Sequence, residues 1–321
     1  MTLVYPSSFA ERTRWILAQR PQRNALDPER PYAYLFEEER SASGEVVPVA
    51  TIFLTNRECP WHCVMCDLWR NTLTAPPEPG AIPRQIDYAL SQLPPARQIK
   101  LYNSGSFFDP HAIPPEDYPA ITALVSQFER IIVECHPLLI TPKLLAFRDR
   151  LAGQLEVAMG LETVHPEVLQ QLNKGMTLDQ FAASAAYLRG NKIDLRVFIL
   201  VQPPFMKPDE SLHWAQRSLD FAFDSGATAA SLIPTRAGNG AMETLAQSGA
   251  FTAPTLATLE AATEYGLQLN RGRVFTDLWD LRNSVPACSD CYPARIARLH
   301  QMNLQQEILE PLACNLCGGC S

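Results

Sequence analysis

Short apolar runs alternate with amphipathic stretches along most of the chain. The apolar runs cover residues 99–102, 130–134, 155–160, 195–201 and 229–233, and the amphipathic stretches cover 85–92, 118–128, 142–151, 166–172, 178–189 and 210–224. Alternation at this spacing predicts βαβ units around a parallel sheet. About six such units between residues 50 and 275 would curve into a barrel or partial barrel. We therefore expect an α/β fold with a partial (β/α)6, TIM-like barrel.

The two ends of the chain follow a different pattern. Residues 8–19 predict an amphipathic helix, and residues 33–56 predict two strands around a turn at Ser43-Gly44. The segment after residue 275 contains five of the nine cysteines. We therefore expect three parts: an N-terminal helix and strand extension (1–49), a core barrel (50–275) and a small C-terminal cysteine-rich, metal-binding extension (276–321).

Composition and charge argue against several classes of protein. Hydrophobic residues make up 46% and charged residues 19% of the chain, as in an ordinary soluble domain. The net charge of −7 disfavours a broad, non-specific grip on nucleic acid. No apolar stretch is long enough to span a membrane, and Glu11, Arg12 and Arg14 precede any long apolar run, unlike a signal peptide. We expect a cytoplasmic protein whose cysteines bind metal rather than form disulfides.

Three cysteines follow the apolar run at residues 51–55. Cys59, Cys63 and Cys66 have the spacing C-x3-C-x2-C, and ligand sites in α/β sheets lie beyond the carboxyl ends of strands. Zinc normally takes four protein ligands, whereas three thiolates suit a [4Fe–4S] cluster with one open iron. The alternatives are a zinc site and three buried cysteines that only pack.

This motif, placed after a first barrel strand, resembles the radical S-adenosylmethionine (SAM) superfamily. The resemblance implies a [4Fe–4S] cluster held by Cys59, Cys63 and Cys66, with SAM chelating the open iron. It further implies reductive cleavage of SAM to a 5′-deoxyadenosyl radical, which abstracts hydrogen from a substrate. Met65 stands where the family often has an aromatic residue.

Three other segments match the superfamily in order and spacing. The turn Asn103-Ser104-Gly105-Ser106 stands where the family has a Gly-Gly-Glu-like turn that receives the SAM amino group, although it lacks the Glu. Glu162 and Thr163 match a segment near the ribose or methionine end of SAM. Arg196 lies in an otherwise apolar run, and the SAM carboxylate or a protein carboxylate such as Glu162 would pair with it.

Residues 50–210 also resemble the branch that contains the radical SAM partner of archaeosine synthase. The segments that match are KLYNSGSFFD at residues 100–109, Glu134-Cys135-His136-Pro137, Asn173-Lys174-Gly175 and Pro203-Pro204-Phe205. That partner acts on a lysine-bearing 7-deazaguanine in tRNA, and the resemblance does not fix the substrate of this chain. Cys135 and His136 follow a strand, where we expect Cys135 to pack in the core rather than act as a hydrogen donor or sulfur carrier.

A second cysteine group lies near the end of the chain. Cys288 and Cys291 are followed, after 22 residues, by Cys314, Cys317 and Cys320. Five thiols exceed what one zinc ion takes, and the last three have ferredoxin-like spacing. We expect an auxiliary [4Fe–4S] cluster, with structural zinc and a redox dithiol as alternatives.

Together these features predict a radical SAM enzyme with an unidentified substrate. Its class is an oxidoreductase, a lyase or a sulfur-inserting transferase, and the resemblance implies an electron donor such as flavodoxin or ferredoxin. One alternative is a tRNA nucleoside modification enzyme or subunit of the archaeosine-synthase type. The other is a non-enzymatic iron–sulfur electron-transfer protein.

Overall fold

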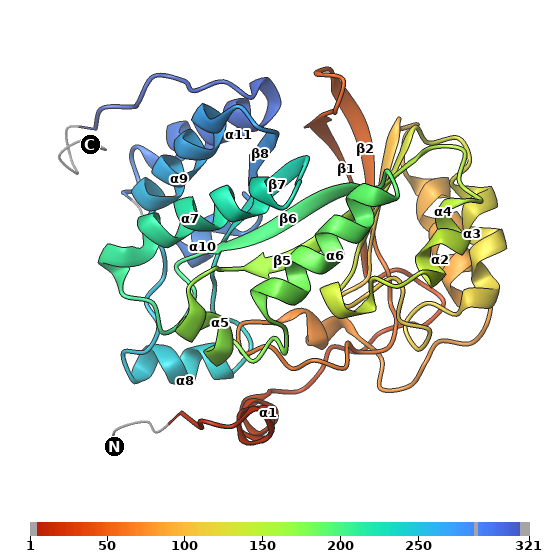
Figure 1. Cartoon of the computed structure of the whole chain (residues 1–321), viewed down its shortest axis with the longest axis horizontal. Helices are drawn as coiled ribbons and strands as arrows, with labels where there is room; N and C mark the ends of the chain where they lie inside the picture. The colour runs from red at the N-terminus through yellow and green to blue at the C-terminus, as the bar shows by residue number, and fades with distance from the viewer. Residues whose placement is uncertain (1–4, 286–287, 315–321) are drawn as a thin grey trace.

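The computed structural model describes residues 5–285 and 288–314, and one eight-stranded sheet organises them (Figure 1). The strands follow chain order in the sheet, with β1 antiparallel to β2 and every later pair parallel. They are β1 (Ala33–Arg40), β2 (Val46–Phe53), β3 (Gln98–Tyr102), β4 (Arg130–Glu134), β5 (Gln154–Glu162), β6 (Asp194–Val201), β7 (Ala229–Pro234) and β8 (Arg273–Thr276). The predicted α/β fold with a partial barrel is confirmed.

Helices cover the convex face of the sheet, where alternate strand residues such as Ile99, Val157 and Val197 form the main apolar core. Alternation places successive strand side chains on opposite faces, so only one face needs this cover. Over the whole described part of the chain, on this face and elsewhere, the helices are α1 (Phe9–Gln19), α2 (Ala81–Gln92), α3 (Tyr118–Leu124), α4 (Lys143–Arg148), α5 (Pro166–Gln171), α6 (Leu178–Gly190), α7 (Ser211–Asp224), α8 (Ala241–Gln247), α9 (Leu256–Leu269), α10 (Leu281–Ser284) and α11 (Tyr292–Gln305). Short 3-10 turns cover Leu68–Asn71, Pro115–Asp117, Pro137–Leu139 and Pro208–Glu210.

A buried ion network fills part of the concave face. Arg196 on β6 pairs with Glu156 on β5 and, across the sheet, with Glu39 on β1, each at 2.6 Å. Arg273 on β8 also reaches Glu156, at 2.9 Å. Side chains from strands that are not neighbours in the sheet therefore meet on its concave face, because the sheet is strongly curled. Lys100 reaches Glu39 at 2.6 Å.

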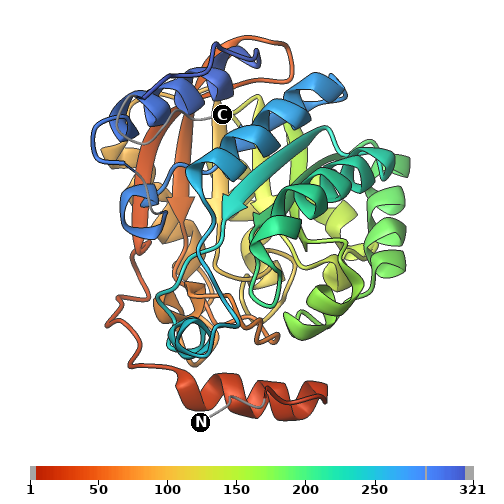
Figure 2. The same ribbon diagram turned by 90° about the vertical axis from the view of Figure 1, so that its left-hand side faces the viewer.

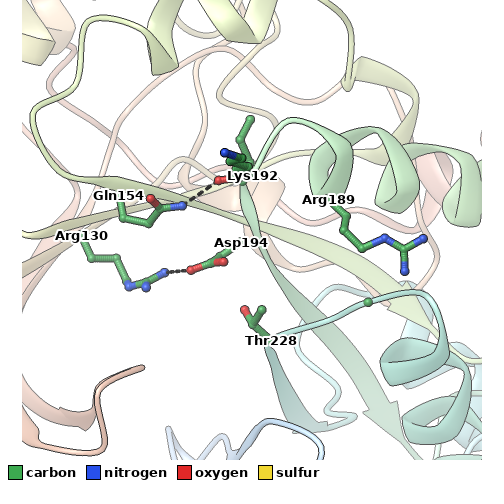
Figure 3. A pocket seen from close by; sticks show the side chains of 8 residues that line it. Arg130, Gln154, Arg189, Lys192, Asp194 and Thr228 are labelled. Carbon is green, nitrogen blue, oxygen red and sulfur yellow. Dashed lines mark hydrogen bonds and ion pairs between the residues drawn. The ribbon is translucent and has the colours of Figure 1, made fainter.

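A pocket of about 460 Å³ opens at the amino ends of the strands (Figure 3). Arg130 and Asp194 lie in its wall and pair at 2.5 Å, and the amide of Gln154 donates to the carbonyl of Lys192. Because β2 to β8 are parallel, this pocket lies at the end of the barrel opposite the loop with Cys59, Cys63 and Cys66.

Helix α11 lies where the sheet does not close, packed against both β1 and β8. The side-chain amide of Gln306 bonds both the N–H and the carbonyl of Val274, at 2.7 and 2.8 Å. Asn303 bonds the same two groups of Thr276, at 2.8 and 2.9 Å. The two amides thus satisfy the free edge of β8 in the way that a further strand would.

None of the helices in the described ranges combines the length and the apolar composition that a bilayer crossing requires.

A candidate metal centre at the carboxyl ends of the strands

The loop with Cys59, Cys63 and Cys66 leaves the carboxyl end of β2. All three are free thiols in half-buried positions. The chain reaches them through Leu54, whose N–H donates to the carbonyl of Tyr102 at the end of β3. The structure therefore places the three predicted ligands at the end of the barrel where α/β proteins bind their ligands.

Two asparagines hold this loop from later parts of the chain. The amide nitrogen of Asn173, after α5, donates to the carbonyl of His62 at 3.1 Å. The amide nitrogen of Asn239, before α8, donates to the carbonyls of Val64 at 2.7 Å and Cys66 at 3.0 Å. Both asparagines are buried. Asn239 carries no motif in the sequence, and sequence reasoning missed it.

The N-terminal helix α1 lies across this end of the barrel (Figure 2). It and the residues that follow it contact Asn173 and the start of the cysteine loop. Arg12 on α1 is buried and donates to the side-chain oxygen of Asn173 at 3.2 Å. Arg20 and Arg23 both pair with Glu58, the residue before Cys59. The N-terminal segment thus fixes the entry to the cysteine loop.

Trp61 stacks on His136 inside the site. The two rings are 3.6 Å apart and nearly parallel, at 9°. Burial and, after it, the nearby Lys174 charge lower the pKa of His136 to about 3, so the ring is neutral near pH 7. Its Nδ1 accepts from the N–H of Leu138, so its Nε2 carries the proton and donates to the carbonyl of Lys174 at 3.1 Å.

A buried ion pair joins two of the family-like segments. The Lys174 ammonium lies 2.6 Å from the Glu162 carboxylate, and both side chains are over nine-tenths buried. Burial alone would lower the pKa of Lys174, but the charges of Glu162 and then Cys63 hold it above its usual range. A Cβ on Gly160 would lie 2.0 Å from Glu162 Oε1 and 2.5 Å from Lys174 Nζ, so only glycine leaves room for the pair.

The turn at residues 103–106 lies against the cysteine loop. A Cβ on Gly105 would lie 3.5 Å from Cys59 Cβ. Glu134 accepts from the N–H groups of Asn103 at 2.6 Å and Gly105 at 3.4 Å. Burial raises the pKa of Glu134, and these N–H groups oppose the rise. The turn lacks a glutamate of its own, but the next strand brings this one to it.

Serine hydroxyls and an amide complete the turn. Ser104 bonds the hydroxyl of Tyr32 at 3.0 Å, and Ser106 accepts from the N–H of His136 at 2.9 Å. Both polar atoms of the Asn103 side chain are buried without a hydrogen-bond partner. Such atoms are rare in folded proteins, and here they leave a donor and an acceptor for a polar ligand group.

Two further predicted residues differ in their surroundings. Thr163 is buried next to Glu162, and its hydroxyl accepts from the N–H of His165 at 3.1 Å. Arg196 lies instead in the ion network, where its guanidinium binds Glu39 and Glu156. The structure thus favours a protein ion pair for Arg196, with carboxylates other than Glu162.

The C-terminal cysteines form a separate group. The sulfurs of Cys288, Cys291 and Cys314 all lie within 4.8 Å of one another. Cys317 and Cys320 lie outside the described residues. Cys135 is buried in the main apolar core, and burial raises its pKa.

The donor set at the first site fits an iron–sulfur cluster. Burial raises the pKa of Cys59, Cys63 and Cys66 to about 12, so without metal these thiols keep their protons. A bound metal reverses this balance because it takes the thiolate form. The side-chain amide of Asn103, which has no hydrogen-bond partner, also suits a polar ligand beside the three sulfurs.

Comparison with known proteins gives two curated relatives of low identity. One is an uncharacterised protein of Methanocaldococcus jannaschii, 22% identical over 236 residues, which are 69% of this chain and 65% of that protein. The other is archaeosine synthase subunit beta of Methanosarcina acetivorans, 25% identical over 192 residues, or 56% of each chain. The chain thus spans between about half and two thirds of these relatives. No family model matches.

Solved structures also resemble the chain in part. An archaeal Elp3 from Methanocaldococcus infernus aligns with a TM-score of 0.49 and 13% identity, over 60% of this chain and 51% of that one. Coproporphyrinogen III oxidase (HemN) of Escherichia coli, a radical SAM enzyme, aligns with a TM-score of 0.46 and 12% identity, over 81% and 55%. The resemblance expected from the motifs is confirmed in sequence: the chain is similar, at low identity, to archaeosine synthase subunit beta.

Proposed function

We propose that this chain is a radical SAM enzyme that holds a [4Fe–4S] cluster on Cys59, Cys63 and Cys66. The observation that supports this most is the cysteine loop itself, placed at the carboxyl end of β2 and fixed by Asn173 and Asn239. When bound, such a cluster supplies the electron that breaks a carbon–sulfur bond of SAM, and the resulting radical abstracts hydrogen from a substrate. Because the cluster must receive this electron, the enzyme requires an electron donor such as flavodoxin or ferredoxin.

The residues around the loop suit the charged methionine end of SAM. The Glu134 carboxylate and the hydroxyls of Ser104 and Ser106 offer acceptors for its amino group, next to Gly105. The Lys174 ammonium, held by Glu162, offers a cation for its carboxylate. Thr163 lies beside this pair. Arg196 has no such role in this proposal because its donors are already paired inside the protein.

A nucleoside in tRNA is the second candidate for the substrate. The support is the similarity to archaeosine synthase subunit beta over more than half of the chain. With a net charge of −7, this chain would need a partner to supply most of the phosphate contacts. Salt-sensitive binding of tRNA to the full chain would support this substrate, and binding that appears only with a partner subunit would assign the contacts to that partner.

The test of the main proposal is formation of 5′-deoxyadenosine from SAM under reducing, oxygen-free conditions. We expect the product with the reconstituted full chain and none with Cys59→Ala, Cys63→Ala or Cys66→Ala. The matched control is Cys135→Ala, which removes a nearby core thiol and should retain product formation. Product formation by Cys63→Ala would contradict the proposal.

A further inference from the structure

The C-terminal cysteine group has a different geometry from the first group. The sulfurs of Cys288 and Cys314 are 3.9 Å apart, and Cys291 lies within 4.8 Å of both. Within the described part of the chain, no other set of three metal-ligating side chains is so compact, and Cys59, Cys63 and Cys66 are therefore more widely spread.

Sulfur separations distinguish the candidate occupants. A tetrahedral zinc ion about 2.3 Å from each sulfur sets neighbouring sulfurs about 3.8 Å apart. A [4Fe–4S] cluster puts an iron between each sulfur and the cluster centre, so cysteine sulfurs lie about 6 Å apart. A disulfide needs about 2.05 Å. The 3.9 Å separation of Cys288 and Cys314, with Cys291 within 4.8 Å of both, is closer to the spacing around a single tetrahedral ion than to the spacing around a cluster.

We propose that Cys288, Cys291 and Cys314 bind one zinc ion, in place of the auxiliary cluster expected from the sequence. These three thiolates supply three of the four ligands that a structural zinc ion takes. This site is independent of the proposed SAM chemistry, since it uses none of the residues of the first loop.

The placement of the ligands gives the ion a structural role. Cys288 and Cys291 lie just before α11, and the edge of β8 is bound by Asn303 on this helix and by Gln306 directly after it. Cys314 ends the described part of the segment that follows α11. An ion bound by Cys288, Cys291 and Cys314 links the segment after α11 to the start of that helix.

Arginines on α11 also hold this helix in place. Arg298 donates to the carbonyls of Leu309 and Glu310, and Arg295 pairs with Glu260 on α9 at 2.5 Å. The helix is thus held on the barrel by ion pairs and hydrogen bonds along its length. The ion links the start of α11 to the segment that runs back past the helix. Zinc suits this structural role because it has no redox chemistry.

Metal content of the full chain tests the proposal. The chain is purified, reconstituted anaerobically with iron and sulfide in the presence of zinc, and assayed for both metals. We expect about one zinc and about four irons per chain. The Cys288→Ser/Cys291→Ser variant should lose the zinc and keep the irons, and Cys59→Ala/Cys63→Ala/Cys66→Ala should keep the zinc and lose the irons. Failure of the SAM chemistry alone would leave the zinc result unchanged.

Two further measurements test the zinc assignment. Cobalt substituted at the C-terminal site should show the visible bands of tetrahedral thiolate coordination, lost in Cys288→Ser/Cys291→Ser and retained in Cys59→Ala/Cys63→Ala/Cys66→Ala. Because zinc fastens α11, Cys288→Ser/Cys291→Ser should also melt at a lower temperature than the parent chain. About eight irons with no zinc, or a C-terminal disulfide in the freshly purified protein, would overturn the assignment.

Discussion

Asn173 and Asn239, which follow different strands of the barrel, donate their side-chain amides to the same cysteine loop. Asn173 binds the carbonyl of His62, and Asn239 binds those of Val64 and Cys66. Backbone carbonyls beside the cysteines are thereby fixed before any metal binds. Such prearrangement lowers the ordering cost of ligand binding, and it links the cysteine loop to the rest of the barrel.

The first prediction concerns Asn239. Asn239→Ala removes the donor to two buried carbonyls, which should lower the free energy of unfolding by about 1–3 kcal/mol and loosen the cysteine loop. We expect fewer irons retained per chain after reconstitution and faster cluster loss in air. Asn24→Ala, which removes an exposed amide bound to Asn71, is the matched control and should retain iron as the parent does. Equal retention in both variants would show that Asn239 does not hold the site.

The second prediction concerns the space at Gly160. Gly160→Ala places a methyl group where Glu162 and Lys174 meet, and such overpacking costs about 1–3 kcal/mol. We expect lower thermal stability and weaker SAM binding, measured by equilibrium dialysis. Gly190→Ala is the control, since nothing lies within 4 Å of its new methyl group, and it should leave both unchanged or raise stability slightly. Unaltered SAM binding in Gly160→Ala would separate the ion pair from the SAM site.

The third prediction separates two roles for Arg196. Arg196→Met leaves Glu39 and Glu156 without this partner, and breaking a buried ion pair costs about 3–5 kcal/mol. We expect a large loss in chemical denaturation, whereas SAM affinity of the remaining folded protein stays near that of the parent. Arg271→Met, which breaks an exposed pair with Asp224, should cost at most about 1 kcal/mol. A selective loss of SAM binding with full stability would instead return Arg196 to the SAM site.

The fourth prediction is a pH dependence that comes from His136. Its pKa in the fold is about 3, against about 6.5 in an unfolded chain. Between these values the unfolded chain binds a proton that the folded chain does not, so stability falls as pH drops below about 6.5, by about 1.4 kcal/mol per unit for this group. Urea unfolding at pH 7 and pH 5 should show a smaller pH effect in His136→Phe and His136→Gln than in the parent. The same pH effect in all three would contradict the assignment.

The sequence predicted where Cys59, Cys63 and Cys66 lie because their spacing pattern is local. Three cysteines directly after an apolar strand should lie at the carboxyl edge of a parallel sheet, and the structure has them there. The strand pattern was equally local, since a strand buried on both faces reads as an apolar run. Helix α9 was not predicted, because its buried face includes Glu260, Thr263 and Gly266 and so lacks a continuous apolar stripe.

Contacts between distant segments could not be predicted in the same way. The partners of Arg196 depend on the curl of the sheet, which brings β1 opposite β6. Asn239 acts through loop geometry that no spacing rule encodes. The sulfur separation at the C-terminal group likewise depends on how α11 and the following segment come together. Each of these is a tertiary relationship between residues far apart in the chain.

Electron paramagnetic resonance of the reconstituted, reduced full chain, recorded with and without SAM, tests whether Cys59, Cys63 and Cys66 hold a SAM-binding cluster. We predict a reduced [4Fe–4S] signal whose shape changes when SAM is added, and which is absent from the Cys63→Ala variant. A signal that SAM leaves unchanged, or one that survives in Cys59→Ala/Cys63→Ala/Cys66→Ala, would contradict the claim that these three cysteines form a SAM-binding iron–sulfur site.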